Sequence, residues 1–240
     1  MNTIKFIITI VSISLCVAQV NTEAMRTENA TLGLTHSFIF DLSYFSGESE
    51  IIQLASSYKM DYLLKSNYYG FIKAEYNRAF EKGNEDFTNR GFIHFRTAKP
   101  ITNKIDDEGF LQKETNHFIN LENRELVGLG LRTNQFNNLY WGLGLMYESE
   151  EYNDIQQIQN NLKSTNYINY KSNISSILTF QNIIYYQFKT SKVNNYRILW
   201  ESNLSIFATE SISIHIKTFY RYDTNGNNHF ELSNGLGIQF

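Results

Sequence analysis

Hydrophobic and polar residues alternate with a period of two along most of the chain after its first twenty residues. Between Leu139 and Glu150, one face carries large apolar side chains, whereas the other carries glycines and Glu148. The segments 196–208 and 211–223 repeat this pattern, with isoleucines, a tryptophan and tyrosines opposite charged or polar residues. A helix would repeat every three to four residues, so the period of two predicts β-strands.

Clusters of Gly, Asn, Asp and Ser separate the alternating segments and predict turns. Several segments are longer than a typical soluble strand and reach the roughly 9–11 tilted residues that cross a hydrocarbon layer. The Asn- and Gln-rich segment 152–170 is predicted to be the longest loop. The weakest strands are 172–180 and 183–189; merging them and dropping one other strand would give ten. The favoured reading has about twelve strands, at 35–45, 50–63, 68–81, 86–98, 106–118, 123–135, 139–151, 172–180, 183–189, 195–209, 211–223 and 229–240.

We therefore expect an all-β chain, folded over residues 35–240 as a closed antiparallel up-and-down transmembrane β-barrel with its apolar face toward lipid. An aromatic content of 15% and a single proline are typical of such a protein. Aromatic side chains near the ends of the apolar faces are candidates for a girdle at the membrane interface: Trp141, Tyr147, Trp200, Tyr220 and Tyr222.

Residues 1–18 are predicted to be a cleaved signal peptide. Lys5 gives a positive start, residues 6–15 are apolar, and Ala18 ends a small-residue cleavage site before Gln19. A lipoprotein modified at Cys16 and a buried N-terminal element are the competing readings. Residues 19–34 are polar and are expected to form a flexible leader.

The C-terminal segment places its apolar residues on one face and ends in Phe240. This ending resembles the closing strand of outer-membrane barrels, whose last aromatic residue is recognised by the insertion machinery. With the signal peptide, it predicts residence in the outer membrane of a Gram-negative bacterium, with outer-membrane lipid and the barrel-insertion machinery as partners.

Many ionisable residues lie on the face that should point into the barrel. Two interpretations compete: an ion-pair network that fills the lumen, which we favour, or a charged path for small ions or solutes. In the network reading, the arginines pair with glutamates on neighbouring strands. The candidate residues are Glu75, Arg96, Glu108, Glu114, Arg124, Arg132, Glu148, Arg197, Glu201 and Arg221.

Other chemistry finds little support in the residues. The five histidines lack metal-ligand spacing, so neither a metal nor another cofactor is expected. The net charge of −3 and the lack of a basic stripe argue against a nucleic-acid partner. A serine–histidine catalytic pair is suggested only by His229 and Ser233, on the inward face. We expect no catalysis; a lipid-modifying outer-membrane enzyme of the lipase or deacylase type and a secreted lipocalin-like ligand-binding barrel are the alternatives.

Several motifs together resemble one known family. They are the stretch 108–112, the stretch 123–132, the glycine-rich 142–148, the pairs Tyr196-Arg197 and Tyr220-Arg221, and the terminal 235–240. The likeness covers about residues 35–240 and is to the salt-induced outer-membrane protein family, domain of unknown function 481. The family often has a proline after Tyr186-Gln187, where this chain has Phe188. The resemblance implies an outer-membrane barrel without established activity, which fits a structural envelope protein or a narrow passive pore.

Overall fold

The computed structural model describes residues 23–27, 30–46, 50–81, 86–136, 138–153, 155–209, 212–224 and 228–238. Over these residues, twelve strands form one antiparallel sheet, and each strand pairs with its neighbours in chain order. The predicted all-β, up-and-down arrangement of twelve strands is confirmed, and the ten-strand alternative is wrong. A short 3-10 helix, η1 (His117–Ile119), joins β5 to β6. The strands are β1 (Gly33–Ser46), β2 (Glu50–Leu63), β3 (Tyr69–Glu81), β4 (Asp86–Pro100), β5 (Ile105–Asn116), β6 (Leu121–Phe136), β7 (Leu139–Tyr152), β8 (Ile155–Ser175), β9 (Leu178–Lys189), β10 (Lys192–Phe207), β11 (Ile212–Asp223) and β12 (His229–Ile238).

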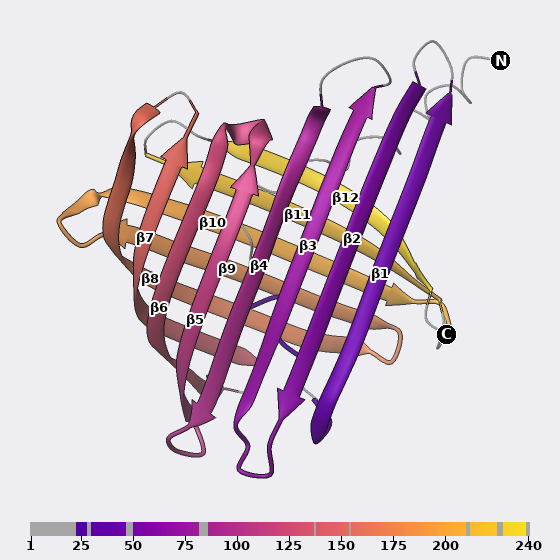
Figure 1. Cartoon of the computed structure of the whole chain (residues 1–240). Helices are drawn as coiled ribbons and strands as arrows, with labels where there is room; N and C mark the ends of the chain where they lie inside the picture. The colour runs from indigo at the N-terminus through magenta and orange to yellow at the C-terminus, as the bar shows by residue number, and fades with distance from the viewer. Residues whose placement is uncertain are drawn as a thin grey trace.

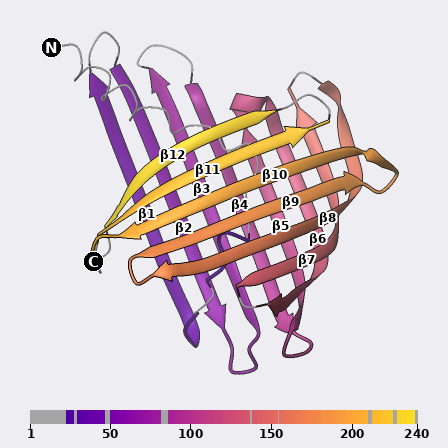
Figure 2. The ribbon, with the colours of Figure 1, turned by 180° about the vertical axis from the view of Figure 1, so that it is seen from behind.

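The sheet curls on itself, so that it has an inner and an outer face (Figures 1 and 2). Strands β1–β5 form one wall, and β8–β12 form the opposite wall and cross it at an angle. Strands β6 and β7 lie where the sheet bends from one wall to the other. No helix within the described part of the chain is long and apolar enough to span a membrane.

The alternation seen in the sequence separates the two faces of the sheet. Leu129 pairs with Leu145 and Leu131 with Leu143 across β6 and β7, and all four leucines are exposed on the outer face. Arg132 and Met146, which follow Leu131 and Leu145 in the chain, point inward and are buried, as does Glu148 further along β7. Because successive side chains of a strand point to opposite faces, this single register fixes the orientation of both strands.

Two inner-face glycines make room for aromatic rings. Gly142 lies opposite Tyr167 in the β7–β8 ladder, and Gly128 lies opposite Phe110 in the β5–β6 ladder. A Cβ atom at either glycine would overlap the ring of its partner. The rings therefore lie over the glycine backbones and fill part of the interior.

Asparagine occupies the left-handed position in two of the short turns. Asn67 between β2 and β3 has φ of 58°, and Asn138 between β6 and β7 has φ of 68°. Both values lie in the left-handed region, which asparagine tolerates better than other side chains. These turns fall in the gaps between the predicted strands, after 63 and before 68, and after 135 and before 139.

The predicted loop at 152–170 is wrong. Strand β8 begins at Ile155 and pairs with β7 from Ile155 to Tyr170, and the predicted strand 172–180 instead contains the turn between β8 and β9. The reason is compositional: apart from Tyr167, the inner positions of β8 are Gln, Asn, Lys and Thr, and several outer positions are also polar. The ladder with β7 and β9 holds this strand without a continuous apolar stripe. The other predicted bounds differ by a few residues, and β1 starts within the predicted leader.

The proposed signal peptide at 1–18 and the terminal Phe240 lie outside the described residues. Of the leader, residues 23–27 and 30–34 are described. Residues 23–27 lie inside the curled sheet rather than away from it, with the Glu23 side chain buried.

Candidate functional site

The interior of the sheet carries two clusters of buried charges. The first, here the Glu148 cluster, contains four basic and four acidic side chains on β5–β8, β10 and β11. The second, the Glu23 cluster, is formed by the leader together with β4, β5 and β6. The Glu148 cluster comprises Glu114, Arg124, Glu148, Glu150, Lys163, Arg197, Arg221 and Asp223. The Glu23 cluster comprises Glu23, Arg26, Arg96, Asp106, Glu108 and Arg132.

Glu148 is the centre of the first cluster and is completely buried, with 0% of its surface exposed. Arg124 donates from Nε to Glu148 Oε1 at 2.7 Å, and Lys163 forms an ion pair with the other carboxylate oxygen. Arg197 Nη1 reaches Glu148 Oε1 at 3.3 Å. Three cations from β6, β8 and β10 therefore converge on one carboxylate.

The remaining members of the Glu148 cluster pair with further donors of its arginines. Arg124 Nη1 donates to Glu114 at 3.0 Å, and Arg197 donates to Glu150 at 3.2 Å and to Asp223 at 2.9 Å. Arg221 contacts Asp223 at 3.5 Å. The formal charges of the eight groups cancel, which is the condition for burying so many ions at a tolerable desolvation cost.

Glu23 is the centre of the second cluster and is 1% exposed. Its Oε2 accepts from Arg96 Nη1 at 3.0 Å, and its Oε1 accepts from Arg132 Nε at 3.0 Å and from Asn169 Nδ2 at 3.2 Å. The backbone N–H of Glu23 donates to the Tyr185 hydroxyl at 3.1 Å. Burial opposes the ionisation of Glu23, but the guanidinium groups of Arg132, Arg26 and Arg96 outweigh it and hold the pKa of Glu23 below its usual value.

The neighbouring residues of the leader are also bound to the wall. Arg26 Nη1 donates to Glu108 Oε1 at 2.6 Å, and its guanidinium lies 5.1 Å from the centre of the Tyr69 ring. The N–H of Thr27 donates to the Tyr69 hydroxyl at 2.9 Å, and its Oγ1 donates to Asp61 at 3.2 Å. The segment 23–27 is thus attached to the inner face by both backbone and side-chain contacts.

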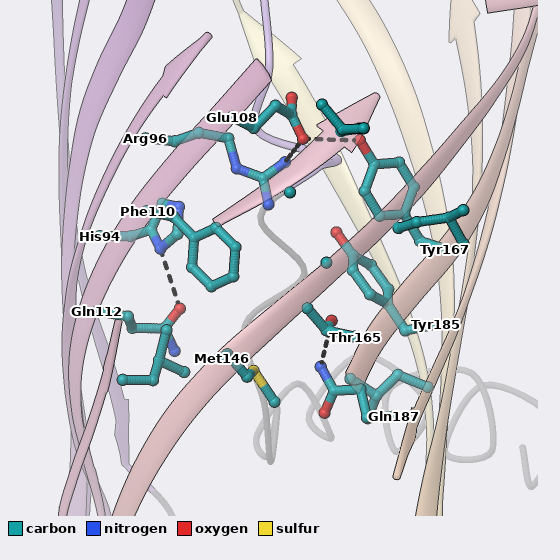
Figure 3. A pocket seen from close by; sticks show the side chains of 16 residues that line it. His94, Arg96, Glu108, Phe110, Gln112, Met146, Thr165, Tyr167, Tyr185 and Gln187 are labelled. Carbon is teal, nitrogen blue, oxygen red and sulfur yellow. Dashed lines mark hydrogen bonds and ion pairs between the residues drawn. The ribbon is translucent and has the colours of Figure 1, made fainter. Parts of the chain in front are cut away.

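A narrow cavity of about 40 Å³ lies against the Glu23 cluster, lined by buried polar and aromatic side chains. Figure 3 shows it with the labelled side chains converging from several strands, Glu108 joined to both Arg96 and Tyr167 and His94 joined to Gln112. Since one water needs about 10–15 Å³ of such volume, the cavity has room for only a few waters. The labelled lining residues are His94, Arg96, Glu108, Phe110, Gln112, Met146, Thr165, Tyr167, Tyr185 and Gln187.

A wider hollow of about 580 Å³ lies at the end of the sheet where the β2–β3 and β4–β5 turns are. Arg26 and Asp106 line it together with turn residues of 100–103 and Asn67. On β6, Arg124 and Arg132 are eight residues apart, on the order of 27 Å along an extended strand. The two charge clusters therefore lie toward opposite ends of the interior.

The predicted charged residues are distributed unevenly between these clusters. Eight of the ten belong to one cluster or the other. Glu75 instead pairs with Lys73 at 2.5 Å, and Glu201 accepts from Asn203 at 2.8 Å. The sequence reading missed Glu23, Arg26, Asp106, Glu150, Lys163 and Asp223. Glu150 shares a face with Glu148 and could have been found from the alternation, whereas Lys163 was concealed by the loop assignment and Glu23 by its place in the leader.

The candidate girdle residues all share the outer face. Trp141 and Tyr147 are exposed there, and Trp200 pairs with Tyr220 across β10 and β11. Tyr222 packs against Tyr196 with ring centres 5.8 Å apart. Tyr196 in turn lies 5.6 Å from Tyr186, so aromatic rings continue across β9, β10 and β11, a row that the sequence reading did not identify.

One serine–histidine arrangement was not anticipated. His215 on β11 contacts Ser205 Oγ through Nδ1 at 2.9 Å and Ser213 Oγ through Nε2 at 2.8 Å. Both ring nitrogens of His215 are hydrogen-bonded to serine hydroxyls, so neither is available to the carboxylate that orients the histidine of a catalytic triad. The backbones of His229 and Ser233 lie in β12, but their side chains are outside the described part of the structure. Within the described part, His, Cys, Asp and Glu form no group of three that could hold a metal.

The chain belongs to the DUF481 family, described as a protein of unknown function, whose sequence profile matches residues 40–237. The predicted family is thus confirmed. No curated protein matches the sequence.

Solved structures with a similar fold have different sequences. The NanC porin is 12% identical with a TM-score of 0.52, over 86% of this chain and 99% of that one. The translocator domain of the autotransporter NalP from Neisseria meningitidis is 12% identical with a TM-score of 0.52, over 89% of this chain and 90% of that one. At these identities, the likeness concerns the fold alone: an antiparallel up-and-down sheet similar to the sheets of these two proteins.

Proposed function

We propose that this protein is an integral barrel of the Gram-negative outer membrane that provides a narrow passive path for small ions or solutes and catalyses no reaction. The main supporting observation is the difference in polarity between the two faces of the sheet. Large apolar side chains are exposed over the outer face, Leu129 to 70%, while compensated charges fill the inner face. An apolar surface of this extent is typical of a protein whose solvent is lipid.

Closure of the sheet between β1 and β12 is part of this proposal. The ladders run from β1 to β12 in order, and the curl brings the two walls opposite each other (Figure 2). An open edge in hydrocarbon would leave a row of N–H and C=O groups without partners, at a cost of several kcal/mol each, roughly. A membrane therefore favours pairing of β1 with β12.

Export and insertion complete the proposal. Residues 1–18 would be removed near Ala18, residues 19–34 would remain as the leader of the barrel domain, and Phe240 would serve the insertion machinery. Trp141, Tyr147, Trp200, Tyr220 and Tyr222 would lie at the membrane interfaces as the aromatic girdle.

A purely structural barrel is the second candidate. The observation that favours it is the small volume, about 40 Å³, of the interior cavity that Arg96, Glu108 and mostly uncharged side chains line. The enzyme and lipocalin alternatives have less support. A lipid-modifying enzyme needs its serine and histidine toward lipid, whereas Ser205 and His215 share the inner face by register. A lipocalin needs its apolar face inside.

Conductance in planar bilayers tests the pore. We expect small discrete current steps, with selectivity that moves toward anions by about twofold when Glu75→Gln removes an inner charge. Glu75 is the suitable position because its side chain is 23% exposed in its pair with Lys73, outside the two buried clusters. Glu125→Gln on the outer face is the matched control and should leave the selectivity unchanged. Absence of current over a wide voltage range would contradict the pore and favour the purely structural barrel.

A further inference from the structure

The Glu23 cluster has an unusual composition, because the wall supplies the cations and the leader supplies the central anion. Arg96 on β4, Arg132 on β6 and Asn169 on β8 converge on the carboxylate of Glu23. These three side chains are 3%, 6% and 1% exposed. Their donors cover both carboxylate oxygens, which is the arrangement that recognises a carboxylate.

The two guanidinium groups are held in place by the wall as well as by Glu23. Arg132 lies 3.8 Å from the centre of the Tyr140 ring, and Arg96 lies 5.4 Å from that of Phe110. Arg96 also contacts Glu108 at 3.7 Å. Aromatic rings and a neighbouring carboxylate orient each guanidinium independently of the leader. The wall therefore keeps its donor arrangement when Glu23 is elsewhere.

The segment that carries Glu23 borders solution. The 580 Å³ hollow at the turn end of the sheet is lined by Arg26, three residues after Glu23, and by Asp106. Glu23–Thr27 is not a strand of the sheet, and its described contacts with the inner face are polar bonds and the small packing contacts of Ala24 and Met25. Such a segment can leave without breaking a ladder.

We propose that Arg96, Arg132 and Asn169 form a carboxylate-binding site that Glu23 occupies in cis, so that residues 23–27 are a displaceable plug and a small carboxylate from solution competes for the site. The carboxylate-binding site does not depend on whether the protein conducts ions. The further consequence, that displacement of the plug widens the conducting path, rests on the pore proposed above. The ligand class is a compact carboxylate because two guanidinium groups and an amide match its two oxygens and single charge. Thr27 acts as a second attachment, through Tyr69 and Asp61.

Thiol labelling of the plug tests this site directly. The full chain with Cys16→Ser and Ala24→Cys has a single thiol, placed next to Glu23. It is folded into lipid vesicles and reacted with a water-soluble maleimide in sodium acetate or in sodium chloride of equal ionic strength. We expect acetate to accelerate labelling saturably and chloride to have little effect. Equal acceleration by the two salts would reflect screening of ion pairs and would overturn the site.

Removing the negative charge of Glu23 provides a second test of the plug in the same labelling experiment. Glu23→Gln should label about tenfold faster than the parent, because Arg96 and Arg132 lose the carboxylate that they share. Glu122→Gln, an exposed glutamate at the start of β6, is the matched control and should label like the parent. Equal rates for Glu23→Gln and Glu122→Gln would overturn the plug, and this comparison needs no variant that removes a wall residue.

Parallel conductance recordings separate this proposal from the pore. Acetate-dependent labelling with no current in any variant supports the carboxylate site and contradicts the pore. Current that is equal in Glu23→Gln and the parent, with labelling insensitive to acetate, supports the pore and contradicts the plug. Larger current steps in Glu23→Gln together with acetate-dependent labelling support both.

Discussion

Replacing Glu148 with glutamine is expected to lower the free energy of unfolding by about 3–5 kcal/mol. The carboxylate is completely buried and receives Arg124, Lys163 and Arg197 from three different strands. Glutamine keeps the size of the side chain but removes the negative charge, so three buried cations lose their shared partner. Equilibrium unfolding by guanidinium chloride in detergent micelles measures the effect.

Glu125→Gln is the matched control for Glu148→Gln. Glu125 also forms an ion pair, with Lys113 at 2.6 Å, but both side chains are more than half exposed on the outer face. Exposed pairs contribute little, and we expect almost no change in stability. Equal losses in the two variants would mean that the Glu148 cluster is not a buried network. A double-mutant cycle with Arg124→Met and Glu148→Gln should give a clearly measurable coupling energy, since Arg124 and Glu148 are hydrogen-bonded to each other.

Leu129→Arg is expected to cost about 2–4 kcal/mol in lipid vesicles, because it places a charge on the lipid side of the barrel near the bilayer midplane. Leu129 is 70% exposed on the outer face and lies in the middle of β6, opposite Leu145. Phe136 is 62% exposed and ends the same strand, so Phe136→Arg should cost only about 0–1 kcal/mol near the interface. Unfolding from vesicles measures both variants. Equal losses of stability in Leu129→Arg and Phe136→Arg would contradict a membrane-spanning β6.

The alternation of side chains was sufficient to predict most of the sheet. Strands such as β7 and β11 have continuous apolar faces, and their register orients every side chain at once. Strand β8 could not be found in this way. Its backbone pairs with β7 and β9, and such pairing does not require an alternation of apolar and polar side chains. A period-two reading detects strands with one apolar face and is blind to strands with two polar ones.

The charged interior was predictable in part for the same reason. Alternation places Arg124, Arg132 and Glu148 on the inner face, and the structure brings each into an ion pair. Which arginine meets which glutamate depends on the register and on the reach of the side chains across several strands, and neither is readable from one strand. The role of Glu23 depends on a segment that lies inside the curled sheet without being one of its strands, so no period-two pattern could reveal it.

Fluorescence of the two tryptophans tests the central claim, that the outer face contacts lipid, without any substitution. Trp141 and Trp200 are the only tryptophans of the chain, and both lie on the outer face by register. In vesicles that contain lipids with brominated acyl chains, we expect strong quenching of the emission and only weak quenching by acrylamide in the water. Strong quenching by acrylamide, with no response to the brominated lipids, would place the tryptophans in water and contradict the membrane barrel.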